Sequence, residues 1–316
     1  MKNELQAPFP YFGGKSAVAA EVWDALGDVK HYIEPFFGSG AVLLARPGHD
    51  PARHVETVND ADGFLCNVWR ALQFAPDETA RWCDWPVNHA CLTARKAELI
   101  RNKDRVLDNL TADPKWCDPV LAGYWIWAAS CWIGHGLTRP GQRPHLGDAG
   151  MGVHKISQIP HLADAGKGVT EPYNANLYAW FRALSERLRY VRVVCGDWTR
   201  VCGGNWQDSM GTVGIFFDPP YGAAATRDPN LYQEESLTVA AEVADWALAR
   251  GDKPTYRIVL AGYYEEHERL LAHGWAVHRW KAKGGYAHVS GTDDNPNCKR
   301  EALFFSPHCQ QQRDLL

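Results

Sequence analysis

The chain has 316 residues, of which 46% are hydrophobic, and its formal net charge is −4 at pH 7. This composition predicts a full hydrophobic core and excludes a largely disordered chain, while the slightly acidic balance offers no overall attraction for polyanions. No apolar run approaches the roughly 18 residues of a membrane span, and no basic-then-apolar signal opens the chain, so we expect a cytoplasmic protein.

The cysteine and histidine patterns indicate neither disulfides nor a metal site. None of the nine cysteines forms a Cys-x-x-Cys pair, and without an export signal we expect reduced thiols that act as small core residues. The 13 histidines show no zinc-finger or metalloprotease spacing, so we expect no metal.

Seven short apolar runs predict buried strands, in chain order at residues 31–35, 54–59, 191–195, 213–217, 257–261, 275–280 and 300–306. Helical patterns lie between many of them, at residues 16–26, 63–74, 177–189, 237–249 and 265–272. Strand–helix alternation of this kind is typical of an α/β fold, with a mostly parallel sheet covered on both faces.

One interval, residues 76–176, breaks this alternation. Its first part is helical and rich in tryptophan, and its second part is rich in Gly, His and Pro. An interruption of this length between two strands indicates an inserted domain, so we expect a catalytic domain of residues 1–75 and 177–316 around it. Within the insert, Trp125, Trp127 and Trp132 fit core packing better than base stacking, and the spacing of Trp125 and Trp132 predicts one helix face.

A glycine turn, Glu34-Pro35-Phe36-Phe37-Gly38-Ser39-Gly40, follows the first predicted strand. Such a turn lets the backbone approach a nucleotide-like ligand where a side chain would clash, although an ordinary strand–helix connection uses the same residues. The turn lacks the third glycine of the dinucleotide fingerprint and the Gly-Lys-Ser/Thr of a phosphate-binding loop.

The second predicted strand leads to Asp60, about twenty residues after the glycine turn. An acid in this place typically accepts hydrogen bonds from ribose hydroxyls. Because Asp60 also precedes a helical pattern, an N-cap role is the alternative.

A third motif, Asp218-Pro219-Pro220-Tyr221, follows a strand that is apolar throughout. The amine of adenine is a poor nucleophile because its lone pair is delocalised into the ring. A carboxylate and a rigid backbone carbonyl can each accept one N–H bond, which frees this lone pair towards a methyl donor. The ring of Tyr221 can stack on the base for about 1–3 kcal/mol, enough to offset much of the cost of extruding a base from a duplex.

With these motifs, the chain resembles the Dam-like, alpha-class family of S-adenosyl-L-methionine (SAM)-dependent N6-adenine DNA methyltransferases. The resemblance covers both ends of the chain and implies a Rossmann-like, seven-stranded sheet with a separate target-recognition domain. Residues 10–16 are similar to the family's aromatic-x-Gly-Gly-Lys motif, which lies against SAM and implies contacts from Tyr11, Gly14 and Lys15.

The other matches imply the remaining roles. The turn residues Glu34, Pro35, Phe36, Gly38, Ser39 and Gly40 would wrap the methionine part of SAM, and Asp60 matches the ribose-binding acid. Asp197 and Trp198 resemble a small Asp-aromatic motif that touches the adenine of SAM. Asp218, Pro219, Pro220 and Tyr221 match the catalytic motif, and Asp218 also faces the cofactor.

The resemblance implies that residues 76–176 are the target-recognition domain, although they match no recognition domain whose specificity could be transferred. Residues 144–153 recur as residues 160–169, with eight of ten positions identical. This duplication indicates either a hairpin that packs on itself or a paired element that contacts DNA. Candidate DNA contacts are Arg139, Arg143, Lys155 and Lys167, together with Arg227 in a loop after the catalytic motif; a second loop spans residues 284–299.

We therefore expect methylation of a flipped adenine in double-stranded DNA, with no metal and no covalent intermediate. The alternatives are another planar amine (cytosine N4, RNA adenine or a protein glutamine amide) and a DNA-binding protein with a vestigial SAM site. Related glutamine enzymes and many RNA enzymes favour Asn at the position of Asp218, and cytosine N4 enzymes usually favour Ser. The Asp in this chain therefore favours adenine. Restriction-modification, orphan and phage roles stay open, and we expect a monomer.

Overall fold

The computed structural model describes residues 5–9, 11, 14–132, 137–138, 177–220, 238–280 and 301–310. The chain divides into two compact units, of which one is helical and the other contains the sheet. The helical unit comprises Met1–Tyr11 and Ala61–Arg189, and the sheet unit comprises Phe12–Asp60 and Tyr190–Leu316.

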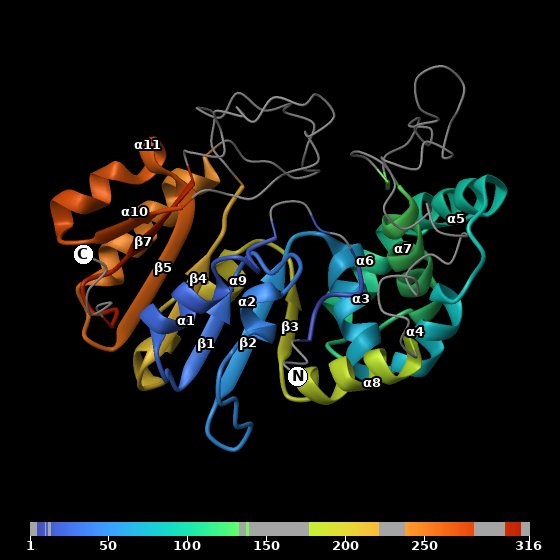
Figure 1. Cartoon of the computed structure of the whole chain (residues 1–316), viewed down its shortest axis with the longest axis horizontal. Coiled ribbons are helices and arrows are strands. Elements are labelled where there is room, and N and C mark those ends of the chain that lie inside the picture. Colours follow the sequence, from blue (N-terminus) through green and yellow to red (C-terminus); the bar gives the residue numbers. More distant parts are fainter. Residues whose placement is uncertain are drawn as a thin grey trace. The chain divides into compact units, whose positions relative to one another are not determined.

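The sheet unit contains seven strands in the order β3-β2-β1-β4-β5-β7-β6 (Figure 1). The strands are β1 (His31–Glu34), β2 (Val55–Asp60), β3 (Arg192–Cys195), β4 (Val213–Phe217), β5 (Tyr256–Tyr263), β6 (Ala276–Arg279) and β7 (Glu301–Phe305). Strands β1 to β5 pair in parallel, whereas β7 runs antiparallel to both β5 and β6. All seven predicted strands are confirmed, and this order with an antiparallel β7 is typical of the SAM-methyltransferase fold.

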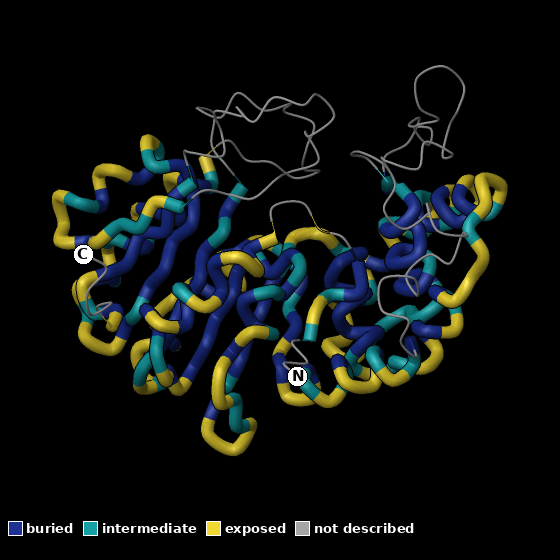
Figure 2. The backbone as a smooth tube through the Cα atoms, viewed as in Figure 1, coloured by how far each residue is buried: buried dark blue, intermediate teal, exposed yellow. Residues whose placement is uncertain are grey.

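Helices cover both faces of this sheet. They are α1 (Ala19–Leu26), α2 (Ala41–Leu44), α9 (Thr199–Cys202), α10 (Val239–Gly251) and α11 (Tyr264–His267), with the 3₁₀ helices η5 (Trp206–Ser209) and η6 (Glu268–His273). The predicted single helix at residues 265–272 is therefore a short α-helix continued by a 3₁₀ helix, a tighter form that serves short connections. All five residues of β4 are buried, as a strand covered on both faces requires (Figure 2).

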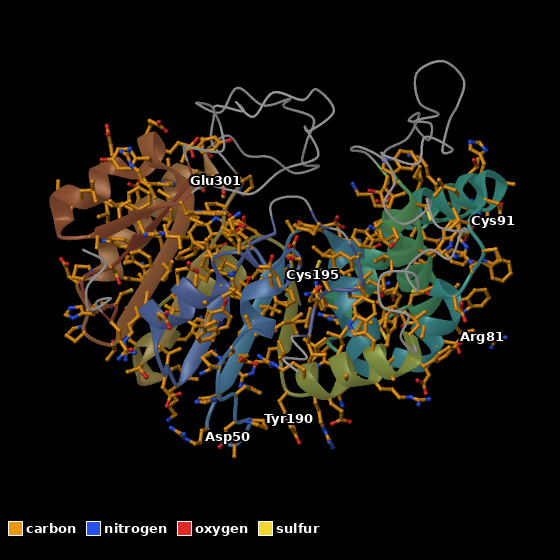
Figure 3. The ribbon with its side chains drawn as sticks, in the orientation of Figure 1. Asp50, Arg81, Cys91, Tyr190, Cys195 and Glu301 are labelled. Carbon is orange, nitrogen blue, oxygen red and sulfur yellow. The ribbon has the colours of Figure 1, made fainter. Side chains whose placement is uncertain are left out.

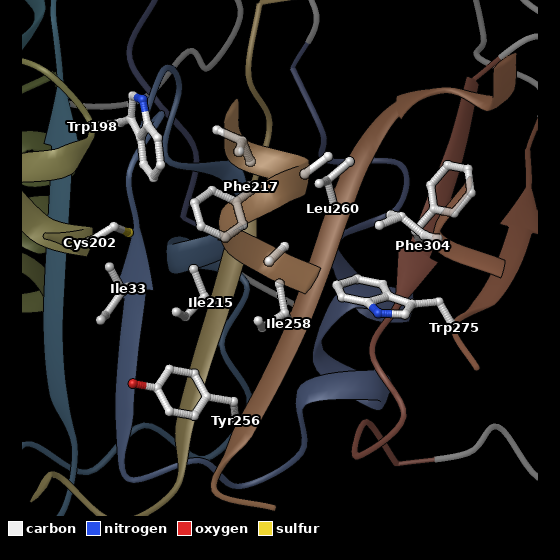
Figure 4. Packing of buried hydrophobic residues seen from close by; sticks show 14 of the residues in the cluster. Ile33, Trp198, Cys202, Ile215, Phe217, Tyr256, Ile258, Leu260, Trp275 and Phe304 are labelled. Carbon is white, nitrogen blue, oxygen red and sulfur yellow. The ribbon is translucent and has the colours of Figure 1, made fainter. Parts of the chain in front are cut away.

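One face of the sheet packs into a continuous hydrophobic cluster. Ile33, Ile215 and Ile258 lie side by side on β1, β4 and β5, and each is fully buried (Figure 4). Trp198 and Phe217 extend this cluster to the carboxyl ends of the strands, with their rings edge to face at 6.1 Å. The core therefore reaches the edge of the sheet where the motif residues lie.

The helical unit contains six described helices: α3 (Gly63–Phe74), α4 (Pro76–Cys83), α5 (His89–Arg101), α6 (Lys103–Ala112), α7 (Pro119–Cys131) and α8 (Leu177–Leu188). Helix α7 packs on α3, α4 and α5, and most of its side chains are buried. This unit is wider than residues 76–176 because α3 and α8 pack on these helices and on each other. The division by function, with recognition in residues 76–176, stays a prediction.

Tryptophans of the helical unit pack around cationic side chains. The Arg95 guanidinium lies 4.5 Å from the ring centroid of Trp127 and 5.1 Å from that of Trp85. Trp125 and Trp127 are buried, which agrees with the core packing expected for them. Trp132 is only partly buried, and its extended backbone lies just beyond the last residue of α7, so the helix face predicted to hold Trp125 and Trp132 is wrong at this position.

Among the described residues, no helix combines the length and apolarity that crossing a bilayer demands. Over the same ranges no group of three His, Cys, Asp or Glu side chains could hold a metal ion, and the eight cysteines described are free thiols.

Candidate functional site

The candidate residues of the sheet unit lie near β1, where the strand order of the sheet reverses. Strand β1 pairs with β2 on one side and with β4 on the other, and the chain proceeds outward from β1 both ways. In open α/β sheets the carboxyl ends of the strands at such a switch point form the ligand-binding edge. The loops that follow β1, β2, β3 and β4 therefore define the candidate site.

The glycine turn after β1 requires glycine at two positions. Gly38 has φ = 50° and Gly40 has φ = 61°, a backbone region in which a side chain is strained. The Gly40 N–H donates to the Phe37 carbonyl over 2.8 Å, and Gly40 is the N-cap of α2. The tight turn predicted from the sequence is present, and it brings the backbone of Gly38 and Gly40 to the carboxyl edge.

Asp60, the last residue of β2, is joined to this turn. Its Oδ2 accepts a hydrogen bond of 2.9 Å from the Gly38 N–H. The N-cap role considered for Asp60 belongs instead to Asp62, whose Oδ1 accepts from the N–H groups of Phe64 and Leu65 at the start of α3. Asp60 therefore presents its carboxylate at the glycine turn, and its contact with a ribose stays a prediction.

Asn59 is a site residue that the sequence analysis missed. Its buried side-chain Nδ2 donates to the Pro35 carbonyl over 3.0 Å and to the Gly196 carbonyl over 2.9 Å, which links the loops after β1 and β3. Its Oδ1 is buried and has no hydrogen-bond partner among the described residues. Asn59 precedes Asp60 in a strand that also carries Glu56 and Thr57, so its residue type alone did not distinguish it from a structural polar residue.

The loop after β3 follows Cys195, the last residue of that strand (Figure 3). Cys195 is the register partner of Asp60. The exposed Asp197 accepts hydrogen bonds at Oδ1 from the Thr199 N–H, over 3.0 Å, and from the Thr199 hydroxyl. Trp198 is buried in the hydrophobic cluster, where its ring stacks on that of Phe36 at 6.5 Å. Of the two predicted cofactor residues, Asp197 thus lies at the surface, and Trp198 supports the glycine turn from the core.

Glu34, the first residue of the motif, is buried behind the turn. Its Oε2 accepts a hydrogen bond of 2.8 Å from the Tyr32 hydroxyl. Burial raises the pKa of Glu34 well above its usual range, and the nearby Asp218 carboxylate raises it further, against the lowering effect of the bonds from Tyr32 and the Leu43 N–H. This side chain thus anchors the base of the turn and the start of α2.

Asp218 follows β4 directly, and its side chain is 22% exposed. The Nζ of Lys15 lies 2.9 Å from the Asp218 Oδ2, and the Lys15 side chain is 6% exposed. Pro219 is buried and Pro220 is partly exposed. The structure thus brings together two residues from motifs at opposite ends of the chain, which the sequence analysis had assigned to separate tasks.

For the other predicted site residues the structure gives only their exposure, or does not describe them. Gly14 is exposed beside Lys15 and Ser39 is partly exposed, whereas Tyr11 belongs to the helical unit and is 37% exposed. The remaining predicted contacts lie outside the described residues: Arg139, Arg143, Lys155, Lys167, Tyr221 and Arg227, together with the duplicated segments and the loop at residues 284–299.

The chemistry of this edge suits a ligand with a nucleoside and an amino acid part. Glycines with positive φ offer close backbone approach, the carboxylates of Asp60 and Asp197 accept from hydroxyl or amine donors, and the unpartnered Asn59 Oδ1 is a further buried acceptor. SAM has these donors, so the residues present fit it.

Residues 11–84 match the family model described as D12 class N6 adenine-specific DNA methyltransferase. The match includes the glycine turn and Asp60. No curated protein matches the chain.

Proposed function

We propose that this chain, whose residues 11–84 match the model of the SAM-dependent D12 class of N6 adenine-specific DNA methyltransferases, methylates N6 of an adenine flipped out of double-stranded DNA at one specific sequence. The observation that carries this proposal is the position of Asp218 at the end of β4, beside the strand β1 that ends in the glycine turn. The switch point thus has a ligand-binding turn on one side and a carboxylate acceptor on the other.

The carboxyl edge of β1, β2 and β3 holds the cofactor in this proposal. The backbone of Gly38 and Gly40 would receive the methionine part, Asp60 the ribose hydroxyls and Asp197 the adenine, and Trp198 would act through Phe36. When bound, SAM supplies an electrophilic methyl group. The hydrogen bond between the Gly38 N–H and the Asp60 Oδ2 supports this arrangement, because it fixes the turn and the carboxylate relative to each other.

Asp218 and the Pro219 carbonyl receive the target base. Each would accept one hydrogen bond from the N6 amine, which draws the nitrogen lone pair out of conjugation with the ring. Buried Pro219 and the adjacent Pro220 restrict the backbone, so the carbonyl has little freedom to turn away. Tyr221 would stack on the flipped base for about 1–3 kcal/mol.

The proposal also assigns the residues that would contact DNA. Residues 76–176 would recognise the target sequence, and Arg139, Arg143, Lys155, Lys167 and Arg227 would bind phosphates. A net charge of −4 requires that such basic residues be concentrated on one surface, because the chain as a whole repels DNA. A monomer that serves restriction-modification, an orphan role or phage protection would use the same chemistry.

The test is incubation of the protein with SAM and unmethylated genomic DNA, followed by digestion to nucleosides and mass spectrometry. We expect N6-methyldeoxyadenosine, and sequencing of the same DNA then gives the recognition site. D218A should abolish the product while SAM affinity, measured by calorimetry, changes only a fewfold. N4-methylcytosine would correct the base, and no methylated deoxynucleoside despite SAM binding would point to RNA, to a protein amine or to a vestigial site.

A further inference from the structure

We infer that Lys15 is a positioning residue for Asp218, whose carboxylate its ammonium holds in the orientation that meets the target amine. This inference rests on the proposed function and assigns Lys15 a task at the substrate, whereas the sequence motif places it against the cofactor. The observation that carries it is the 2.9 Å distance between the Lys15 Nζ and the Asp218 Oδ2.

Both partners are held by fixed backbone within the sheet unit. The Lys15 carbonyl accepts a hydrogen bond of 3.1 Å from the Val18 N–H, which ties it to the turn that leads into α1. Asp218 directly follows Phe217, the last residue of the buried strand β4. Because the two side chains are 6% and 22% exposed, solvent screens their attraction less than it screens a surface ion pair.

A second carboxyl group, that of Glu34, interacts electrostatically with Asp218. Tyr32 and Glu34 project from the same face of β1, and the Asp218 carboxylate is among the causes that raise the pKa of Glu34. Arg46, a cation that acts on Tyr32, is already paired with Glu56 at 3.2 Å, where His49 also approaches. Of these two cations, Lys15 is the one placed at Asp218.

Glu34 is held by donors of its own. The buried Glu34 accepts hydrogen bonds from Tyr32 and from the Leu43 N–H, and burial raises its pKa well above its usual range. Without the ammonium, an ionised Asp218 would face the buried acids with less compensation and with a wider choice of side-chain orientations.

The experiment compares wild type, K15M and K15R as full chains, with calorimetric SAM affinity and the single-turnover rate at saturating SAM between pH 5 and 9. We expect K15M to slow methyl transfer about 100-fold, the size of effect that follows from small misplacements of reacting groups. SAM affinity should stay within about threefold, because the lost contact is made to Asp218 and not to SAM.

Two further features separate positioning from simple structural support. The acid limb of the K15M rate profile should move to higher pH, and K15R should recover part of the rate, since it restores the charge with a different donor geometry. Loss of SAM affinity with an unchanged rate at saturating SAM would overturn the inference and return Lys15 to the cofactor. Wild-type values of both quantities in K15M would overturn it as well.

A double-mutant cycle tests the pairing without any methylation assay. Urea unfolding of K15M, D218N and the double variant should show non-additive losses, with the double variant more stable than the sum of the single losses predicts. Additive losses would overturn the inference. If wild type methylated no DNA, the proposed function would fail, and the cycle would still decide whether Lys15 and Asp218 are coupled.

Discussion

The backbone N–H of Gly38 donates a hydrogen bond to the Asp60 Oδ2 over 2.9 Å, which ties the turn after β1 to the end of β2. Glycine at position 38 allows the positive φ that aims this N–H at the carboxylate. One acidic side chain therefore has two tasks in the proposed site, because it shapes the turn and is also the acceptor offered to a ribose.

This double task predicts a strong effect of removing Asp60. D60A should weaken SAM binding by at least about tenfold, because a hydrogen bond to a charged group contributes about 1.5–3 kcal/mol and the turn also loses its anchor. D60N keeps an acceptor for Gly38 and should lie between D60A and wild type. Calorimetric titration with SAM measures all three affinities.

Asp62 provides the matched control, two residues further along the chain. Its carboxylate caps α3, so D62A should cost about 1 kcal/mol of unfolding free energy and leave SAM affinity unchanged. Equal losses of SAM affinity in D60A and D62A would contradict the assignment of Asp60.

The positive φ of Gly38 predicts that alanine is poorly tolerated there. G38A should lower the unfolding free energy by about 1–2 kcal/mol and also weaken SAM binding, since the turn must open to relieve the strain. Gly48 has a similar φ of 58°, and among the described residues no heavy atom beyond those of Gly48 and its two chain neighbours lies within 4 Å of the position that a Cβ would take there. G48A should therefore show a comparable loss in urea unfolding with SAM affinity intact, and a loss of affinity in G48A would place the cofactor elsewhere.

The bridging side chain of Asn59 predicts a combined loss of stability and binding. N59A leaves the buried Pro35 carbonyl and the partly buried Gly196 carbonyl without this donor, which should cost about 2–4 kcal/mol in urea unfolding. Because the loops after β1 and β3 would separate, SAM affinity should fall as well.

Asn67 in the helical unit is an equivalent residue away from the site. Its buried amide exchanges two hydrogen bonds with the Asp118 backbone, at 2.9 and 2.7 Å. N67A should therefore lose similar stability while the remaining folded protein binds SAM as wild type does. If N59A also kept full SAM affinity, Asn59 would be structural only.

The strands were predictable because their physical signal is local. Each of the seven lies in a short segment with strand-forming residues between turns, and β4 shows the apolar pattern most fully, with five buried residues. The glycine turn and Asp218 were predictable for the same reason, since they immediately follow such segments. The boundary of the helical unit was less predictable. Periodicity shows which face of α3 or α8 is apolar, but it does not show which helix covers that face.

Contacts between distant segments were beyond the sequence. The pairing of Lys15 with Asp218 depends on where β4 lies relative to the turn before α1, and the bonds of Asn59 depend on the insertion of β2 between β1 and β3. Local patterns set each of these strands, whereas their order arises from packing of the whole sheet. Residue types therefore predicted the members of the site but not their partners.

A buried histidine in α11, the short helix that follows β5, predicts how stability depends on pH. His267 is 1% exposed, and neither ring nitrogen has a hydrogen-bond partner in the described part of the chain. Burial lowers the pKa of His267 from 6.5 to about 4, with a smaller contribution from Arg269. Between these pH values the unfolded chain binds the proton and the folded protein does not, so stability is present above pH 6.5 and is lost as the pH falls towards 4.

H267F removes this titration and keeps an aromatic ring against Phe304, whose ring lies 5.7 Å away. From pH 7 to pH 4 the unfolding free energy of wild type should fall relative to H267F by as much as about 3 kcal/mol, measured by urea unfolding at each pH. His31, whose pKa is also lowered to about 4, is common to both proteins and cancels. H273Q, which replaces a nearby exposed histidine, is the control variant. Parallel curves for H267F would mean that His267 gains a partner or solvent in the folded protein and is not held neutral.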